Sequence, residues 1–111
     1  MEDKDQVVFR REKTLETVKG YLIRIKMKLK KLPEPYGQEF PNGYKFSWIA
    51  YNVKNDQERI LFDNHTNKPP HIHTNGHEEY FTWISLVETE KLFLVRTQQR
   101  FGHFEIELDK I

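Results

Sequence analysis

The fold is decided by one stretch of alternating side chains, Tyr21-Leu22-Ile23-Arg24-Ile25-Lys26-Met27-Lys28-Leu29-Lys30. Successive side chains of a β-strand point to opposite faces, so an extended conformation collects the odd-numbered positions into one apolar face. The even-numbered positions form a second face that is strongly basic from Arg24 onward. A helix would distribute both kinds of side chain around its circumference. The stretch therefore predicts a strand with one face toward a core and the other toward solvent.

The flanking segments predict further strands. Residues 7–11 are β-prone and precede a turn at Gly20, which predicts a hairpin with the basic strand. Residues 32–43 contain three prolines and two glycines and predict an irregular loop. Two more strands are expected, over residues 44–53 and 58–62, joined by a polar turn. Residues 104–111 alternate again and predict a terminal strand, whereas residues 1–6 predict a frayed start.

Residues 86–101 are predicted to form the main helix. Ser85 and Glu88 have the spacing of a capping box, good helix formers follow, and Gly102 is a stop signal. A continuous apolar run at residues 92–95 keeps a strand open as an alternative over residues 91–101. Together these segments predict an α+β fold, with a small curved, mostly antiparallel β-sheet and one main α-helix packed on its apolar face.

Length and composition indicate one domain, residues 1–111. The chain is 37% hydrophobic and 14% aromatic, and so many large rings argue against disorder. The net charge is +1, so no polyanionic or membrane partner is demanded by the overall charge. There are no cysteines, which excludes disulfides and cysteine nucleophiles. Neither a signal peptide nor a long apolar run is evident, so a soluble, cytoplasmic protein without a membrane partner is expected. A homo-oligomer is left open.

Residues 61–80 hold four of the five histidines. His71 and His73 are one residue apart, so an extended backbone directs both imidazoles to the same side and Ile72 to the other. Pro69 and Pro70 favour that extended backbone. His65 follows a predicted strand and is placed to complete the group.

Acid–base catalysis without a cofactor is one chemistry that such a cluster supports. Imidazoles titrate near neutral pH, so one can accept a proton while another donates one. Asp63 would orient a histidine, and Arg59 or Lys45 would stabilise charge on phosphorus. The candidate catalytic residues are therefore His65, His71, His73, Asp63, Arg59 and Lys45.

Metal binding is the alternative. A divalent metal such as zinc would be held by His65, His71, His73 and Glu78. The order His71-x-His73 followed by Glu78 is similar to the local spacing of cupin metal sites. A third interpretation makes these residues loop histidines that run no reaction. Asn64 is expected to shape a turn after the strand rather than to act in catalysis.

The basic face of the strand predicted over residues 21–30 predicts a binding surface. Its outward residues are Arg24, Lys26, Lys28 and Lys30, spaced roughly 6.5–7 Å apart, which suits contacts to a nucleic-acid backbone. A solvated sheet face and a docking surface for an acidic protein are equally consistent with the pattern.

The middle of the chain resembles a known family. Gly43-Tyr44-Lys45-Phe46, then Leu61-Phe62-Asp63-Asn64-His65, then Pro70-His71-Ile72-His73 occur in the order seen in the TumE-like family. Members of that family are regarded as toxins of type II toxin–antitoxin pairs. The resemblance implies an intracellular toxin neutralised by a cognate antitoxin, typically a helix-turn-helix protein. Combined with the histidines, it predicts a toxin acting on RNA as a metal-independent ribonuclease. The alternative is a non-enzymatic module that binds protein, nucleic acid or metal.

Overall fold

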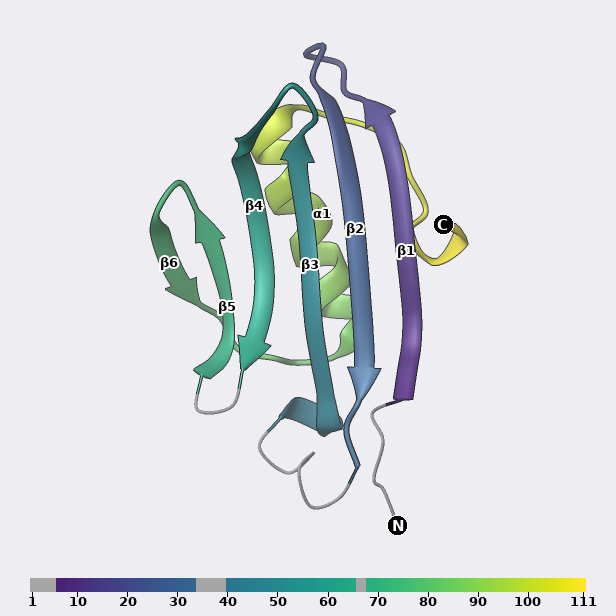
Figure 1. The fold of residues 1–111 in the computed structure, drawn as a ribbon, viewed down its shortest axis with the longest axis vertical. Coiled ribbons are helices and arrows are strands. Elements are labelled where there is room, and N and C mark those ends of the chain that lie inside the picture. The colour runs from purple at the N-terminus through teal and green to yellow at the C-terminus, as the bar shows by residue number, and fades with distance from the viewer. Residues whose placement is uncertain (1–5, 34–39, 66–67) are drawn as a thin grey trace.

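A six-stranded antiparallel sheet forms the framework of the computed structural model, which describes residues 6–33, 40–65 and 68–111. The strands lie across the sheet in chain order, as a β-meander (Figure 1). They are β1 (Gln6–Glu16), β2 (Leu22–Lys31), β3 (Tyr44–Asn52), β4 (Asn55–His65), β5 (Lys68–Thr74) and β6 (His77–Tyr80). Each strand can reach its neighbour through a short connection, because antiparallel pairs need no crossover.

Strand β2 has the alternation that the sequence predicts. It pairs with β1 on one side and β3 on the other, so it lies inside the sheet. Its buried apolar positions meet those of β3, where Met27 lies opposite Trp48 and Leu29 opposite Phe46. The basic positions occupy the opposite face. An interior strand needs two pairing partners and one apolar face, and this stretch has both.

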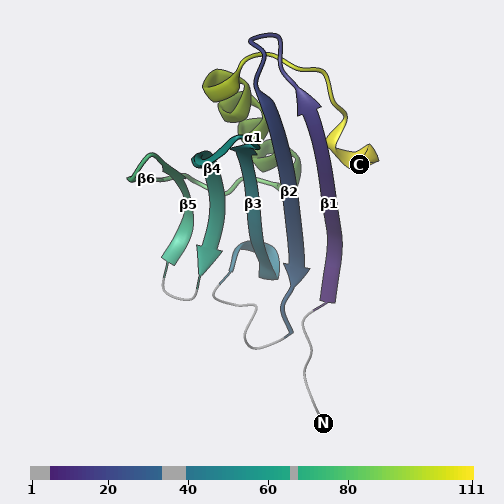
Figure 2. The ribbon, with the colours of Figure 1, turned by 45° about the horizontal axis from the view of Figure 1, so that its top comes forward.

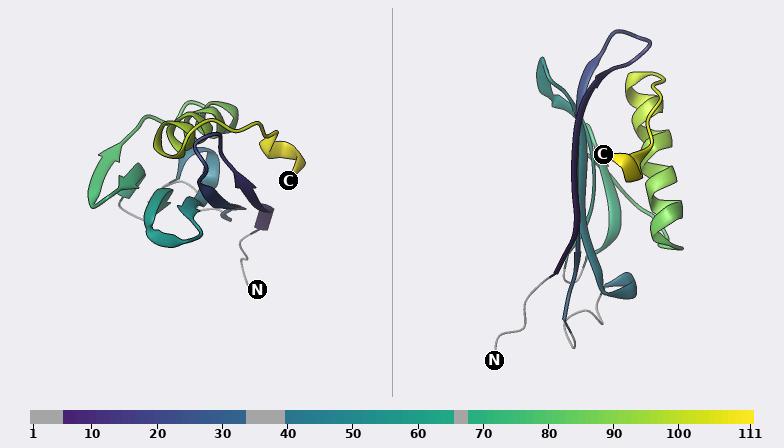
Figure 3. Two further views of the ribbon diagram at one scale, coloured as in Figure 1. Left: turned by 90° about the horizontal axis from the view of Figure 1, so that it is seen from above. Right: turned by 90° about the vertical axis from the view of Figure 1, so that its right-hand side faces the viewer.

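The helix α1 (Leu86–Phe101) covers the apolar face of the sheet (Figure 3). Its predicted N-cap is confirmed, because the Ser85 Oγ accepts a hydrogen bond from the Glu88 N–H at 3.1 Å. Gly102 ends the helix at a φ of 102°, and the strand alternative over residues 91–101 is wrong. The α+β prediction is thus confirmed. The core comprises Ile23, Ile25, Met27, Leu29, Phe46, Trp48, Ala50, Ile60, Phe62, Ile72, Phe93, Phe101, Phe104 and Leu108.

The other face of the sheet is left open. In the side view of Figure 3, the helix and the C-terminal segment both lie on one side of the sheet. Figure 2 shows β1 and β6 at opposite edges, with α1 behind the sheet. Among the described residues, no helix covers the face of the sheet that is turned toward the viewer. Outward side chains of β2 to β6 therefore face solvent together.

The predicted C-terminal strand is wrong. Residues 102–107 have no regular structure, and a short 3-10 turn, Leu108–Lys110, follows. The carbonyl of His103 accepts a hydrogen bond from the Val18 N–H, and the carbonyl of Phe104 accepts one from the Gln98 side chain. The first bond holds the segment to the turn between β1 and β2, and the second holds it to α1. Phe104 is buried in the core. Alternation correctly indicated burial there, but burial against a helix needs no strand ladder.

The frayed start and the irregular loop that the sequence predicts can each be compared with the structure only in part. The frayed start at residues 1–6 falls mostly outside the described residues, and Gln6 already belongs to β1. Within the loop predicted at residues 32–43, residues 34–39 lie outside the described part. The remainder is not wholly irregular, because Pro41–Gly43 forms a 3-10 turn before β3.

Candidate functional site

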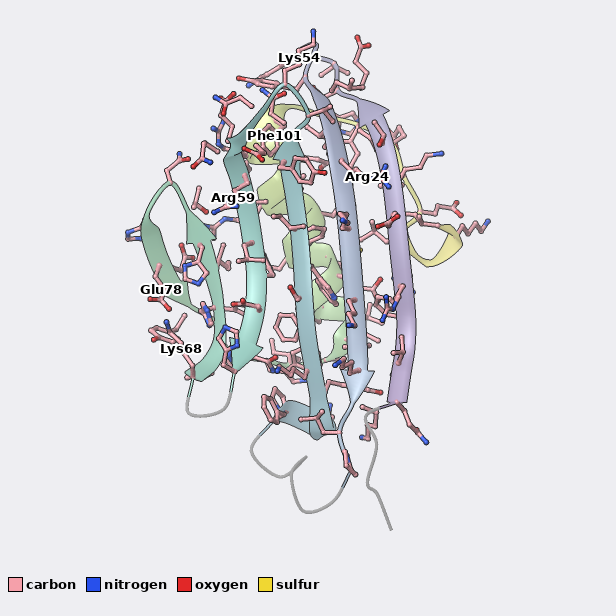
Figure 4. The ribbon with its side chains drawn as sticks, in the orientation of Figure 1. Arg24, Lys54, Arg59, Lys68, Glu78 and Phe101 are labelled. Carbon is pink, nitrogen blue, oxygen red and sulfur yellow. The ribbon has the colours of Figure 1, made fainter. Side chains whose placement is uncertain are left out.

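The histidine cluster lies on the open face, where β4, β5 and β6 pair. Asp63 of β4 stands opposite His71 of β5, and His73 stands opposite Glu78 of β6. The rings of His71 and His73 have centroids 4.6 Å apart, while Ile72 between them is buried in the core. The prediction that the two histidines share one side is confirmed. Figure 4 shows Glu78 and Lys68 at this edge of the sheet and Arg59 further along β4.

Asn64 fixes the local geometry that brings the side chains of Asp63 and His65 together. The register of β4 against β5 shifts between Asp63 and His65, as in a β-bulge. The Asn64 side chain lies beside β3 there, where its Oδ1 accepts from the Phe46 N–H and its Nδ2 donates to the Tyr44 carbonyl, both at 3.0 Å. The expected structural role of Asn64 is confirmed. The expected turn is wrong, because these bonds keep residues 63–65 in the strand.

Replacing Asn64 by alanine is expected to lower the free energy of unfolding by about 2–4 kcal/mol, because two backbone groups of β3 lose their partners. Urea unfolding followed by circular dichroism measures the change. Asn55→Ala, at an exposed position of β4, is the matched control and should change little. Equal effects of the two substitutions would show that the Asn64 bonds do not hold β3 to β4.

His71 is the most enclosed member of the cluster, with no exposed surface. Its Nδ1 lies 2.8 Å from the backbone carbonyl of Pro69. A carbonyl only accepts, so Nδ1 must carry the proton and donate it. In the neutral imidazole the other nitrogen, Nε2, then presents a lone pair. That lone pair belongs to the atom that lies 2.6 Å from Asp63 Oδ1.

Three buried atoms of the cluster have no hydrogen-bond partner within the described part of the chain. They are Asp63 Oδ1, His71 Nε2 and Glu78 Oε1, although the Glu78 oxygen also lies 2.8 Å from the Lys68 ammonium. The first two are within ion-pair distance at 2.6 Å, but their orientation does not meet hydrogen-bond geometry. Two acceptors this close repel each other unless a positive charge lies nearby. A cation shared by both atoms would supply that charge.

The other candidate ligand atoms lie on two sides of this contact. His73 Nε2 is 3.9 Å from Asp63 Oδ1, and Glu78 Oε1 is 3.7 Å from His71 Nε2. On the other side of the carboxylate, His65 Nε2 is 3.2 Å from Asp63 Oδ2. Among the described residues, two groups of three donors lie within 4.8 Å of one another: Asp63, His65 and His71, and His71, His73 and Glu78. The cluster therefore has the donors of a metal site, with His71 common to both groups.

The sequence did not indicate Asp63 as a candidate metal ligand. Asp63 was expected to orient a histidine, and it lies within 4 Å of all three histidines of the cluster, so it is also a candidate ligand. The signal that identifies it is the strand register, because Asp63 pairs directly with His71. His77 lies outside both groups of donors and is exposed at the start of β6.

Lys68 sets the charge of Glu78. The Lys68 ammonium lies 2.8 Å from Glu78 Oε1, and this contact lowers the pKa of Glu78 and raises the pKa of Lys68. Glu78 is therefore an ionised carboxylate at neutral pH, ready to bind a cation. Any metal at this oxygen competes with the lysine, so Glu78 is a weaker ligand candidate than Asp63.

Lys45 and Arg59, which were predicted to stabilise charge on phosphorus, lie on opposite sides of the histidine cluster. Lys45 lines a hollow of about 250 Å³ together with Asp63 and His65. Arg59 lines another, of about 540 Å³, together with His73 and Glu78. The sequence placed both residues near the histidines, and the structure puts each beside a different part of the cluster.

The basic residues of β2 divide into two halves. Arg24 donates to Glu12 at 3.0 Å and to Thr14 at 2.7 Å, and Lys26 lies 3.7 Å from Glu12, so this half is paired to β1. Lys28 and Lys30 instead line the hollow that contains Lys45. Only this second half of the predicted nucleic-acid surface adjoins the histidine cluster.

A bidentate ion pair joins β6 to the helix. The two terminal nitrogens of the Arg96 guanidinium, Nη1 and Nη2, each donate to a Glu79 carboxylate oxygen at 2.8 Å, and these bonds lower the pKa of Glu79 below its ordinary value of 4.5. A lowered carboxyl pKa contributes stability above pH 4.5 that is lost as the pH falls further. Glu79→Gln should therefore destabilise the protein at pH 7 but much less at pH 3. Thermal unfolding at both pH values, with Glu16→Gln as control, measures this; an effect that does not depend on pH would contradict it.

Compared with known protein families, with curated proteins and with solved structures, the chain matches none. The resemblance to TumE-like toxins and the antitoxin partner therefore stay predictions. In the described part of the chain, no helix has the length and apolar character needed to cross a membrane.

Proposed function

We propose that this protein binds a divalent transition metal, best matched by zinc, on the open face of its sheet. The ligands are His71, His73 and Asp63, and Glu78 completes the set when it leaves Lys68. One observation carries the proposal: the buried Nε2 of His71 faces Asp63 Oδ1 at 2.6 Å without hydrogen-bond geometry. The Nδ1 proton, held by the Pro69 carbonyl, leaves Nε2 as the ligand atom.

The donor set and its spacing suit zinc. Two imidazoles with one or two carboxylates are common zinc ligands, whereas magnesium and calcium favour oxygen alone. Donors around a tetrahedral zinc with bonds of about 2.0–2.1 Å lie roughly 3.3 Å apart. The distances within the cluster, 2.6, 3.7 and 3.9 Å, bracket that value.

The chemistry depends on how many protein ligands the metal keeps. With four protein ligands a zinc ion stabilises the fold, and with three it activates a bound water. His65, which is 52% exposed and lies beside Asp63 Oδ2, would then be positioned to exchange protons at the open side.

Tag-free protein is expected to bind one zinc per chain, as measured by elemental analysis and by titration against a chromophoric chelator. His71→Ala and His73→Ala should each weaken binding more than about tenfold, because each removes a ligand. His77→Ala is the matched control, since it removes a nearby histidine that lies outside the cluster. Substoichiometric zinc under saturating conditions, or equal losses in all three variants, would refute the proposal.

Metal-independent acid–base cleavage of RNA, the activity expected of a TumE-like toxin, is the second candidate. The observation that favours it is the pair of partly exposed imidazoles, His65 and His73, on either side of the Asp63 carboxylate. His71 has no exposed surface, so in this function it would position Asp63 rather than touch RNA. Cleavage of a labelled RNA in EDTA that is lost in His73→Ala would support this candidate. Cleavage that occurs only when zinc is added would reject it, and so would the absence of any RNA cleavage.

A further inference from the structure

The hollow beside the histidine cluster is lined mainly by basic and polar side chains, as anion sites are. It is formed where β2, β3 and β4 lie side by side, and it is lined by Lys28, Lys30 and Lys45 together with Asp63 and His65. Lys30 and Lys45 are direct cross-strand partners. Side chains in such pairs are about 4.5–5.5 Å apart at Cβ, so both lysines can reach one anion bound between them.

We propose that this hollow, the lysine hollow, seats a backbone phosphate of a single-stranded nucleic acid. Three lysines line a shallow, open site of about 250 Å³, which admits a phosphate group but does not enclose a whole nucleotide. The strand then crosses the open face toward the second hollow, where Arg59 supplies another cation beside His73. The histidine cluster lies between the two hollows. The ligand class rests on the RNA-directed candidate above, but the binding site itself requires neither cleavage nor metal.

Exposed aromatic side chains favour a single strand over a duplex. Tyr80 is 55% exposed and its ring centroid is 5.8 Å from that of His71. Tyr51 lies opposite Arg59 in the β3–β4 pair and opposite Arg24 in the β2–β3 pair. Unpaired bases stack on aromatic rings and on guanidinium planes, as they do on other sheet surfaces.

Fluorescence anisotropy with a fluorescein-labelled ten-nucleotide oligouridylate tests the proposal. Lys30→Ala and Lys45→Ala should each weaken binding by at least about threefold and reduce the slope of log affinity against log salt by about 0.7. Lys45→Arg should retain binding, because it keeps the charge. Lys13→Ala is the control, since Lys13 pairs with the buried Ile25 and so lies on the helix side of the sheet. It should change neither affinity nor slope.

Three results would overturn the proposal. They are no binding of the oligouridylate at low salt, equal effects of Lys45→Ala and Lys13→Ala, and tighter binding of a ten-base-pair duplex than of the single strand. The measurement is made in EDTA and repeated with zinc, and zinc binding is measured separately on the same preparation. Zinc binding without RNA binding would refute only the lysine hollow, and RNA binding in EDTA without zinc binding would refute only the metal site.

Discussion

Asp63→Asn is expected to weaken zinc binding more than about 100-fold while leaving the metal-free protein as stable as before or up to about 1 kcal/mol more stable. The substitution replaces a carboxylate ligand by an amide of the same shape. The new Asn Nδ2 can donate to the His71 Nε2, which the carboxylate faces at 2.6 Å without a hydrogen bond. A repulsive contact thus becomes an attractive one. Competitive zinc titration and urea unfolding in EDTA measure the two effects.

The same substitution distinguishes a metal site from a simple ion pair. If His71 were a cation in the metal-free protein, Asp63→Asn would leave a buried charge unpaired and destabilise the fold by several kcal/mol. Asp56→Asn, at an exposed position of the same strand, controls for the loss of one negative charge. A large loss of stability in Asp63→Asn but not in Asp56→Asn would contradict the metal site.

Phe93→Ala is expected to have the largest effect on stability, lowering the free energy of unfolding by about 3–5 kcal/mol. Phe93 is fully buried and is the helix residue that meets the centre of the sheet. Its ring centroid lies 5.2 Å from that of Phe62 and 5.7 Å from that of Trp48, edge to face in both pairs. The substitution removes these contacts and leaves a cavity between helix and sheet. Guanidinium unfolding monitored by circular dichroism measures the loss.

A loss of that size is a large share of the stability of a small domain, so a milder variant is needed alongside. Phe93→Leu should lose about 1–2 kcal/mol and remain folded. Val95→Ala, two residues further along α1 at a position that is 47% exposed, should change stability by less than about 0.5 kcal/mol. Similar losses at positions 93 and 95 would show that the helix does not pack on the sheet through Phe93.

Strands β1 to β4 and the helix were predictable because their signals are local. In β2 each second residue is apolar, and this period of two fits only an extended chain with one buried face. The Ser85 cap, Glu88 and Gly102 lie within one helix and its ends. Such signals require no knowledge of which segment packs against which.

The C-terminal segment shows the limit of those local signals. Phe104 and Leu108 are buried as their alternation indicates, but the partner is a helix rather than a strand. Alternation reports which side chains are covered, and it carries no information about what covers them.

The candidate site was predictable in part for the same reason. The shared side of His71 and His73 follows from spacing within one strand. The contact between Asp63 and His71 depends on the register of β4 against β5, which includes a shift after Asp63. The Asn64 bonds to β3 depend on residues 18 and 20 positions away in the sequence. Neither contact can be read from a single segment.

The metal site is tested most directly by anomalous scattering at the zinc absorption edge from a crystal grown with equimolar zinc. The account predicts one peak per chain, about 2.0–2.2 Å from His71 Nε2, His73 Nε2 and Asp63 Oδ1. It also predicts that the hydrogen bond between His71 Nδ1 and the Pro69 carbonyl is retained. A peak only at exposed histidines such as His77 or His103, or no peak within the cluster, would contradict it.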